Sequence, residues 1–240
     1  MFVLEKQMTP ILTNSLKHLS AALSESIECS SSALALEFPV KYRIIDVAIA
    51  YALPDFLTND ISTLKCFKYL NGFSIGILSQ FWLYNKVSIQ KLQNELFLDQ
   101  KVIEKYVSKL LKCNLITQVS KNSYTATELK SLKELGLISI ELKLYNWKEA
   151  LEQAEFNLLF SDFSFVALDK SRISDKNDIL PFFKKKNIGL LVVSNNGAIE
   201  PLFTPKKNKK YDKNLYVSQR IKIIQGLALQ QKWHTIQTIL

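Results

Sequence analysis

Cysteine and histidine are scarce in this chain of 240 residues, which has three cysteines and two histidines. Cys29, Cys66 and Cys113 are far apart and form no CxxC pair, and His18 and His234 are equally distant from one another. This scarcity argues against a zinc site, a disulfide framework or a histidine-based catalytic triad. We expect the cysteines to be reduced thiols in a cytoplasmic protein.

Glycine and proline are also infrequent, with six of each, and 48% of the residues are hydrophobic. This composition is typical of a folded globular chain and not of a disordered one. No apolar run reaches the length of a membrane span, and the first ten residues lack the pattern of a secretion signal. The sequence therefore predicts one large or two small domains, with no membrane partner.

Acidic residues are fewer than basic ones, 22 against 31, which gives a net charge of +9. The excess is concentrated in two regions: residues 71–136 carry nine basic and five acidic side chains, and residues 201–240 carry eight and one. The remaining segments are close to neutral. Basic regions beside a near-neutral remainder favour a polyanionic partner, which we expect to be DNA, without excluding RNA.

The segment Leu137–Gln153 begins as an apolar strand and continues as a helix whose apolar residues recur at helical spacing. Glu141 and Lys143 interrupt the strand two positions apart, so they project from the same face. A second apolar run, residues 42–53, has a carboxylate, Asp46, in its interior. Carboxylates on neighbouring strands can hold a hard divalent cation between them, although Glu141 and Lys143 can equally form a structural ion pair.

Asp46, then Glu141-Leu142-Lys143, then a helix carrying Gln153, resembles the PD-(D/E)XK nuclease superfamily, the restriction-endonuclease-like fold. In that superfamily a helix precedes a β-meander, the aspartate lies on the second strand, and the (D/E)XK motif lies on the third. The resemblance implies that Asp46, Glu141 and the main-chain carbonyl of Leu142 bind Mg²⁺ or Mn²⁺. It also implies that Lys143 positions the attacking water and that Gln153 orients Lys143 or this water.

Asp46 and Glu141 are 95 positions apart, where a compact member of that superfamily has little more than a hairpin. The intervening residues predict helices over 75–84, over 87–96 with Ser88 as the N-cap, and after Asp99, followed by two strands around Lys121-Asn122. This arrangement resembles a winged helix-turn-helix. Its third helix would present Lys101, Lys105, Lys109 and Lys112 to DNA phosphates, and its wing would present Lys121. Use of the same domain for protein contacts or for a homodimer stays open.

The predicted fold class is therefore α/β, a mixed sheet flanked by helices in a restriction-endonuclease-like core, with an inserted winged-helix domain. Residues 1–70 and 128–240 would form the core, and residues 71–127 the insertion. Within the core we expect a first helix over Thr9–Ser26 and a last helix over residues 215–238. Glu25, Glu28 and Glu37 are further candidates for the acidic cluster. Further phosphate contacts are expected from Arg43 and from the lysine-rich run, through Lys206, Lys207, Lys209 and Lys210.

The function predicted from these features is metal-dependent hydrolysis of phosphodiester bonds in DNA, an endonuclease-like activity with Mg²⁺ or Mn²⁺ as the cofactor. The alternative is a non-catalytic DNA-binding or regulatory protein, built on a nuclease-derived scaffold, in which the winged helix does the work. Binding of a divalent cation separates the two, because a regulator does not require it.

Overall fold

The computed structural model describes residues 2–14, 32–40, 43–53, 61–127, 134–173, 176–229 and 233–236. The chain divides into two compact units. The first consists of Met1–Ala52, Gly136–Tyr211 and His234–Leu240, and the second of Leu53–Leu135 and Asp212–Trp233. Each unit is therefore assembled from segments that are distant in the sequence.

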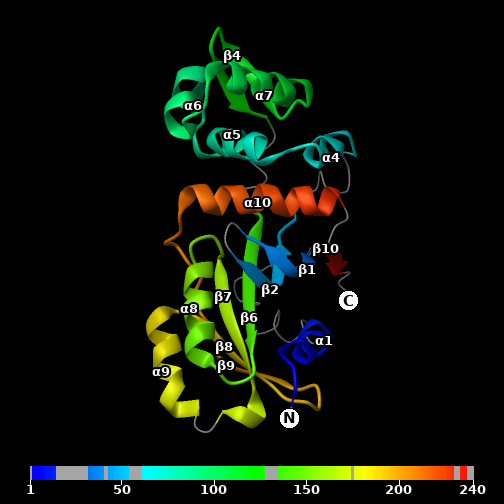
Figure 1. The fold of residues 1–240 in the computed structure, drawn as a ribbon, viewed down its shortest axis with the longest axis vertical. Helices are drawn as coiled ribbons and strands as arrows, with labels where there is room; N and C mark the ends of the chain where they lie inside the picture. The colour runs from blue at the N-terminus through cyan, green and yellow to red at the C-terminus, as the bar shows by residue number, and fades with distance from the viewer. Residues whose placement is uncertain are drawn as a thin grey trace. The chain divides into compact units, whose positions relative to one another are not determined.

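A seven-stranded mixed sheet lies at the centre of the first unit, in the order β10-β1-β2-β6-β7-β8-β9 (Figure 1). The strands are β1 (Ser32–Pro39), β2 (Ile44–Tyr51), β6 (Gly136–Lys143), β7 (Phe163–Asp169), β8 (Gly189–Val193), β9 (Ile199–Phe203) and β10 (Trp233–Ile236). β6, β7 and β8 are parallel, whereas β1–β2, β2–β6 and β8–β9 are antiparallel. The first unit is thus mixed α/β, as the sequence predicts.

Helices connect the parallel strands of this sheet, because two parallel neighbours need a long crossover. α8 (Trp147–Asn157) connects β6 to β7, and α9 (Lys176–Lys186) connects β7 to β8 after the short 3₁₀ helix η3 (Lys170–Arg172). Before the sheet come η1 (Glu5–Gln7) and α1 (Met8–Asn14). The predicted first helix therefore begins one residue before Thr9. Its remainder lies outside the described residues, and so do the candidates Glu25 and Glu28.

Apolar side chains cover both faces of the sheet, in two separate clusters. One cluster joins alternate residues of β2, β6 and β7 to Met8 and Leu12 of α1. The other joins β7 and β8 to buried residues of α8 and α9, which lie along the same flank of the sheet (Figure 1). Because strand side chains alternate, Ile140 and Leu142 face α1, and residue 141 between them faces α8.

Two glycines of this sheet lie directly under aromatic rings of the neighbouring strand. A Cβ atom built on Gly136 would lie 1.9 Å from the ring of Tyr51, and one on Gly189 would lie 2.0 Å from the ring of Phe165. Gly136 pairs with Tyr51 and Gly189 with Phe165 in the strand registers. The rings cover backbone that carries no side chain, so glycine is required at both positions.

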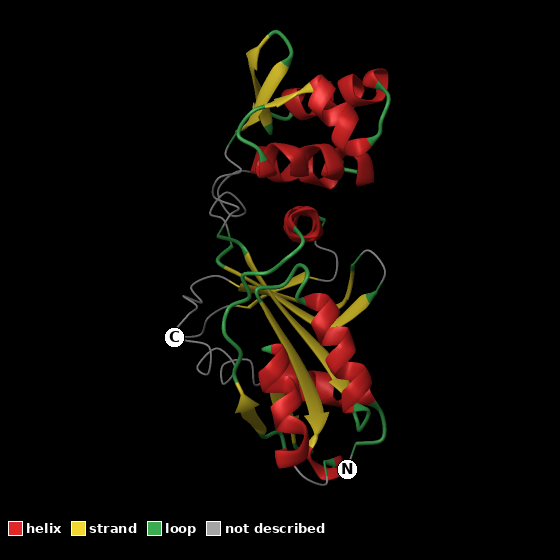
Figure 2. Cartoon of the chain, turned by 90° about the vertical axis from the view of Figure 1, so that its left-hand side faces the viewer, coloured by secondary structure: helices red, strands yellow, loops and turns green. Residues whose placement is uncertain are grey.

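The second unit combines helices with a small antiparallel sheet of order β3-β5-β4, which lies beside the helices in Figure 2. Its elements are α4 (Ile61–Lys68), α5 (Gly72–Leu83), β3 (Val87–Ser88), α6 (Ile89–Leu96), α7 (Gln100–Lys112), β4 (Ile116–Ser120), β5 (Ser123–Ala126) and α10 (Lys213–Ala228). Ser88 caps α6 by accepting from the Lys91 N–H, and Lys121-Asn122 join β4 to β5, as predicted. Asp99 precedes α7 but makes no side-chain capping bond.

The C-terminal part of the chain departs from the sequence-based expectation. The predicted last helix, residues 215–238, ends at Ala228 after passing through Gly226 without a break, and β10 follows. α10 also belongs to the second unit, whereas the prediction placed it in the core. It is joined there by long-range bonds: Gln80 Nε2 donates to Asn214 Oδ1, and the buried Arg220 donates from Nε to the carbonyl of Leu135.

Candidate functional site

Asp46 and Glu141 lie opposite each other at the point where the pairing of β2 with β6 ends. The last pair in this ladder is Val47 with Ile140, and the next residues outward are Asp46 and Glu141. Opposed residues of an antiparallel pair share a face. The N–H of Leu142 donates to Asp46 Oδ2 at 2.7 Å, so the aspartate side chain replaces the next main-chain acceptor.

Glu141 is almost fully enclosed, with 5% of its surface exposed. Its Oε1 accepts a hydrogen bond of 2.6 Å from Nδ2 of Asn157, which is fully buried in α8. Burial, and after it the charge of the nearby Asp46, raise the pKa of Glu141 from 4.5 to about 7, against the lowering effects of Asn157, Lys143 and Arg43. The protein by itself therefore does not compensate the charge of this carboxylate.

Asp46 is perturbed in the same direction. Burial raises the pKa of Asp46, against the lowering effects of the Leu142 N–H, the Lys143 charge and a side-chain hydrogen bond with Glu141. Each carboxyl group shifts the pKa of the other, so the two lie close together. Two adjacent, desolvated carboxyl groups share a proton or hold a cation, because both cannot stay ionised and uncompensated.

The side chain of Lys143 extends from the same face of β6 as that of Glu141, and it lies among several carboxylate side chains. Its Nζ lies 3.5 Å from Glu5 Oε2 and 3.6 Å from Glu149 Oε1, and its side chain is 18% exposed. Burial lowers the pKa of Lys143, but Glu5, Glu149 and Asp46 outweigh it, and the net direction is upward. The lysine is therefore held as a cation among four carboxyl groups.

Gln153 contacts the site through a hydrogen bond to Glu149, one of the carboxylates beside Lys143. Its Nε2 donates to Glu149 Oε1 at 3.2 Å, and Nδ2 of Asn146 donates to Glu149 Oε2 at 2.9 Å. The buried Oε1 of Gln153 and Oδ1 of Asn157 have no hydrogen-bond partner in the described part of the chain. Gln153 thus lies one side chain away from Lys143, and the site keeps two buried acceptors available for a further group.

Sequence patterns did not lead us to predict Glu5, Glu149 or Asn157 as site residues. Glu149 and Asn157 are spaced four residues to either side of Gln153, so the three share one face of α8, and this spacing could have identified them. Glu5 gave no such signal, because it comes from a distant segment.

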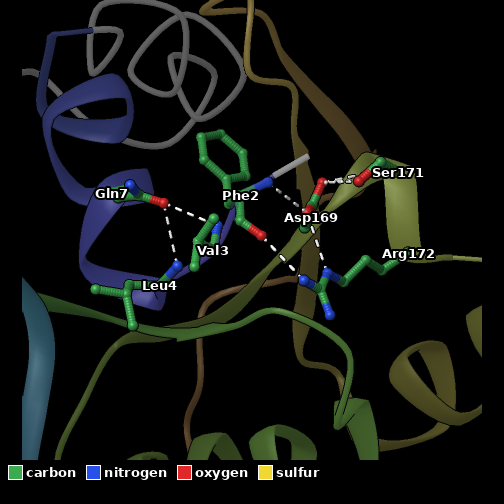
Figure 3. Close-up of polar contacts among 7 residues, drawn as sticks. All are labelled: Phe2, Val3, Leu4, Gln7, Asp169, Ser171 and Arg172. Atoms are coloured by element: carbon green, nitrogen blue, oxygen red, sulfur yellow. Dashed lines mark hydrogen bonds and ion pairs between the residues drawn. The ribbon is translucent and has the colours of Figure 1, made fainter.

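Hydrogen bonds fix the segment that carries Glu5 to the carboxyl end of β7 (Figure 3). The N–H of Phe2 donates to Asp169 Oδ2 at 3.2 Å, and Nη2 of Arg172 donates to the Phe2 carbonyl at 3.0 Å. Gln7 Oε1 accepts from the N–H groups of residues 3 and 4. The start of the chain is thereby held beside the end of β6, with Glu5 at Lys143.

A cavity of about 660 Å³ adjoins the carboxylates, and Glu37, another predicted member of the acidic cluster, lines it together with Asp46. Its full lining is Glu5, Lys6, Thr9, Pro10, Thr13, Leu36, Glu37, Asp46 and Leu142. Glu141 and Lys143 do not line it. A ligand in this cavity would reach the site from the Asp46 side.

The predicted phosphate-binding residues lie in three places. Arg43 is in the first unit, with its guanidinium carbon 5.0 Å from the ring centroid of Phe156. On α7 of the second unit Lys101, Lys105 and Lys109 are exposed, and Lys121 is exposed in the turn between β4 and β5. The segment after β9 contains the third set of exposed lysines: Lys206, Lys207, Lys209 and Lys210. The structure does not bring the last group to the carboxylates, as described below.

Within the described ranges, no group of three or more His, Cys, Asp or Glu side chains is arranged to hold a metal ion. No described helix is long and apolar enough to cross a membrane. No protein-family model matches the chain, and no curated protein or solved structure matches it significantly.

Proposed function

We propose that this protein is a metal-dependent nuclease of the PD-(D/E)XK type that hydrolyses phosphodiester bonds in DNA. The observation that carries the proposal is the position of Asp46 opposite Glu141, just beyond the end of the β2–β6 ladder, with Lys143 on the same face as Glu141. Strand order supports it, because an antiparallel β1-β2-β6 meander is followed by a crossover helix and a parallel strand. This is the arrangement that the resemblance implies.

A divalent cation suits the residues present. Asp46 Oδ1 and Glu141 Oε2 are the carboxylate oxygens not used by Leu142 N–H or Asn157, and oxygen ligands are those that Mg²⁺ and Mn²⁺ prefer. The raised pKa values of both carboxyl groups indicate that the nearby cations do not offset the burial of their negative charge, which a bound metal ion would do. With the main-chain carbonyl of Leu142, the protein would supply three ligands, two of them carboxylates, and water the rest.

The cation would supply polarisation of the phosphoryl oxygen and a lowered pKa for a bound water. The chain's own residues would do the rest. Lys143 would place its ammonium group against the developing negative charge of the phosphate, and Glu149 would hold it in position. Gln153 would fix Glu149 from the next turn of α8 and offer its free Oε1 to the water.

For DNA binding we propose the second unit, as a winged helix. The chain order α5-β3-α6-α7-β4-β5 and the β3-β5-β4 sheet support this assignment. α7 would be the recognition helix, since it turns Lys101, Lys105 and Lys109 to solvent, and the turn with Lys121 would form the wing. α10 would be an addition to this domain.

One observation favours the alternative, a regulator that binds DNA without cleaving it. The described residues include no three-carboxylate metal group. A two-carboxylate site binds a cation more weakly, and a scaffold that has lost catalysis would retain the winged helix and the basic surface.

Cleavage assays with a matched pair of lysine variants test the proposal. Wild-type protein should cut DNA in the presence of Mg²⁺ or Mn²⁺ and not in EDTA. Lys143→Ala should reduce cleavage by orders of magnitude while leaving DNA affinity nearly unchanged, because it removes the cation at the reacting phosphate. Lys148→Ala, at an exposed lysine in the first turn of α8, should leave cleavage intact. Failure to cut duplex, single-stranded and branched DNA would leave the regulator as the function.

A further inference from the structure

Two lysine-rich runs that are 20 residues apart in the sequence meet on the first unit. The first run is Lys184, Lys185 and Lys186 at the end of α9, and the second is the segment 206–210. Asn187 joins them: Lys206 N–H donates to Asn187 Oδ1 at 2.9 Å, and Asn187 Nδ2 donates back to the Lys206 carbonyl at 2.8 Å. The structure therefore creates one basic surface from two separate runs.

The first run is held in place by the end of α9. Asn187 has a left-handed backbone conformation, with φ of 55°, and the N–H of Ile188 donates to the carbonyl of Phe183 at 3.0 Å. This pattern ends a helix abruptly, and Asn is one of the few residues that tolerate it. The three lysines are thus fixed on the last turn, with Asn187 directed at the second run.

The second run is held at Asn208. Its N–H donates to the carbonyl of Asp162 at 2.7 Å, and its Nδ2 donates to the carbonyl of Leu158 at 2.5 Å. Its Oδ1 accepts from the N–H of Lys210 at 2.9 Å. The lysines of this segment therefore project from a backbone that hydrogen bonds hold in place.

Most of this positive charge has no ion-pair partner among the described residues. Lys186 pairs with Glu155, at 2.5 Å, and Lys207 lies 3.7 Å from Asp162. No ion pair in the described part of the chain involves the other five, which are all exposed: Lys184, Lys185, Lys206, Lys209 and Lys210. An ordered surface with five uncompensated ammonium groups suits a regularly spaced polyanion.

The basic surface and the carboxylate site lie at opposite ends of the parallel strands. Asp162, which contacts Lys207, also accepts the N–H of Leu137 at the start of β6, whereas Glu141 and Lys143 are at its end. Four residues of strand separate Leu137 from Glu141, or about 13 Å, which equals about four phosphate steps along one DNA strand. These lysines are therefore expected to contact phosphates other than the reacting one.

We propose that the surface formed by Lys184, Lys185, Lys206, Lys209 and Lys210 is an exosite, which binds DNA backbone phosphates several nucleotides away from the scissile one. The proposal rests on the proposed nuclease function for the meaning of "scissile", but the DNA contact can be measured without cleavage. As an exosite, the surface contributes to binding and not to the chemical step, so its loss raises KM and leaves kcat unchanged.

Salt-dependent DNA binding in EDTA tests the exosite, with fluorescence anisotropy of a labelled duplex. Lys184→Ala/Lys185→Ala and Lys209→Ala/Lys210→Ala should each weaken binding at least several-fold and reduce the salt slope by up to about 1.8, or about 0.9 for each lost contact. Lys65→Ala/Lys68→Ala removes the same charge from exposed positions on α4, outside the elements α5 to β5 of the proposed winged helix, and should do neither. Asn187→Gly keeps the helix end and the net charge but disconnects the runs, and should weaken binding as well.

The outcomes separate this surface from the nuclease assignment. If both pairs behave like the α4 control while wild-type protein cuts DNA, the exosite is refuted and the nuclease stands. If both pairs weaken binding but no substrate is cut, the nuclease fails and the phosphate-binding surface stands. If the lysine pairs weaken binding and Asn187→Gly does not, the two runs act independently and the composite surface is refuted.

Discussion

Replacing Glu141 by glutamine should stabilise the metal-free protein at alkaline pH. Glutamine keeps the size of the side chain and the Oε1 that accepts from Asn157, but carries no charge. Folding raises the pKa of Glu141 from 4.5 to about 7, so the folded state holds the proton more tightly than the unfolded chain. Stability from this group is therefore fully present below pH 4.5 and is lost as the pH rises through about 7.

The size of the effect follows from the shift. Each pKa unit is worth about 1.4 kcal/mol, so the wild type should lose about 3 kcal/mol from this residue between pH 4.5 and pH 8.5. The Glu141→Gln variant should not lose this stability, because glutamine carries no charge at either pH. Urea unfolding in EDTA at both pH values measures it, with exposed Glu152→Gln on α8 as the control for the same chemical change. An advantage of Glu141→Gln that is equal at both pH values would refute a buried, uncompensated carboxylate.

Three further predictions concern packing, polar satisfaction and the cation. Gly136→Ala should lower the free energy of unfolding by about 1–3 kcal/mol, because the added methyl group overlaps the ring of Tyr51. Thermal melts measure this loss, and they should show little change for the control Gly72→Ala, where the added methyl group has open space. Asn157→Ala should cost about 1–3 kcal/mol in urea unfolding, because it leaves a buried oxygen of Glu141 without its donor. Mn²⁺ should raise the melting temperature of wild-type protein and not that of Asp46→Ala, since only an intact site binds it in the folded state.

Much of the fold could be predicted because its strongest patterns are local. Alternation and apolar runs identified β2 and β6, and the spacing of apolar residues identified α8 and α7 close to their observed bounds. The two-residue turn at Lys121-Asn122 and the Ser88 cap are likewise encoded within a few residues. Each of these elements needs only its own sequence to be recognised.

The C-terminal error has a long-range cause. Residues 233–236 become β10 by pairing at the edge of β1, about 200 positions earlier, which no local pattern reveals. The assignment of α10 to the second unit depends similarly on Gln80, Arg220 and other distant contacts.

The candidate site was predictable in part. Asp46, Glu141 and Lys143 interrupt apolar strands, and a charge in such a run is visible in the sequence. Glu5 could not be predicted as a site residue from the sequence, because only the hydrogen bonds of Phe2 to Asp169 and Arg172 bring it to Lys143. The lysine-rich run was visible as composition, but its anchoring through Asn187 and its distance from Glu141 depend on the sheet.

Anomalous scattering from a crystal of wild-type protein grown with Mn²⁺ would reveal directly whether Asp46 and Glu141 bind a cation. We expect one strong anomalous peak between the carboxylates of Asp46 and Glu141, with the Leu142 carbonyl among its ligands, and no such peak in Glu141→Gln crystals. If wild-type crystals show no Mn²⁺ at these residues, the metal-dependent nuclease is contradicted.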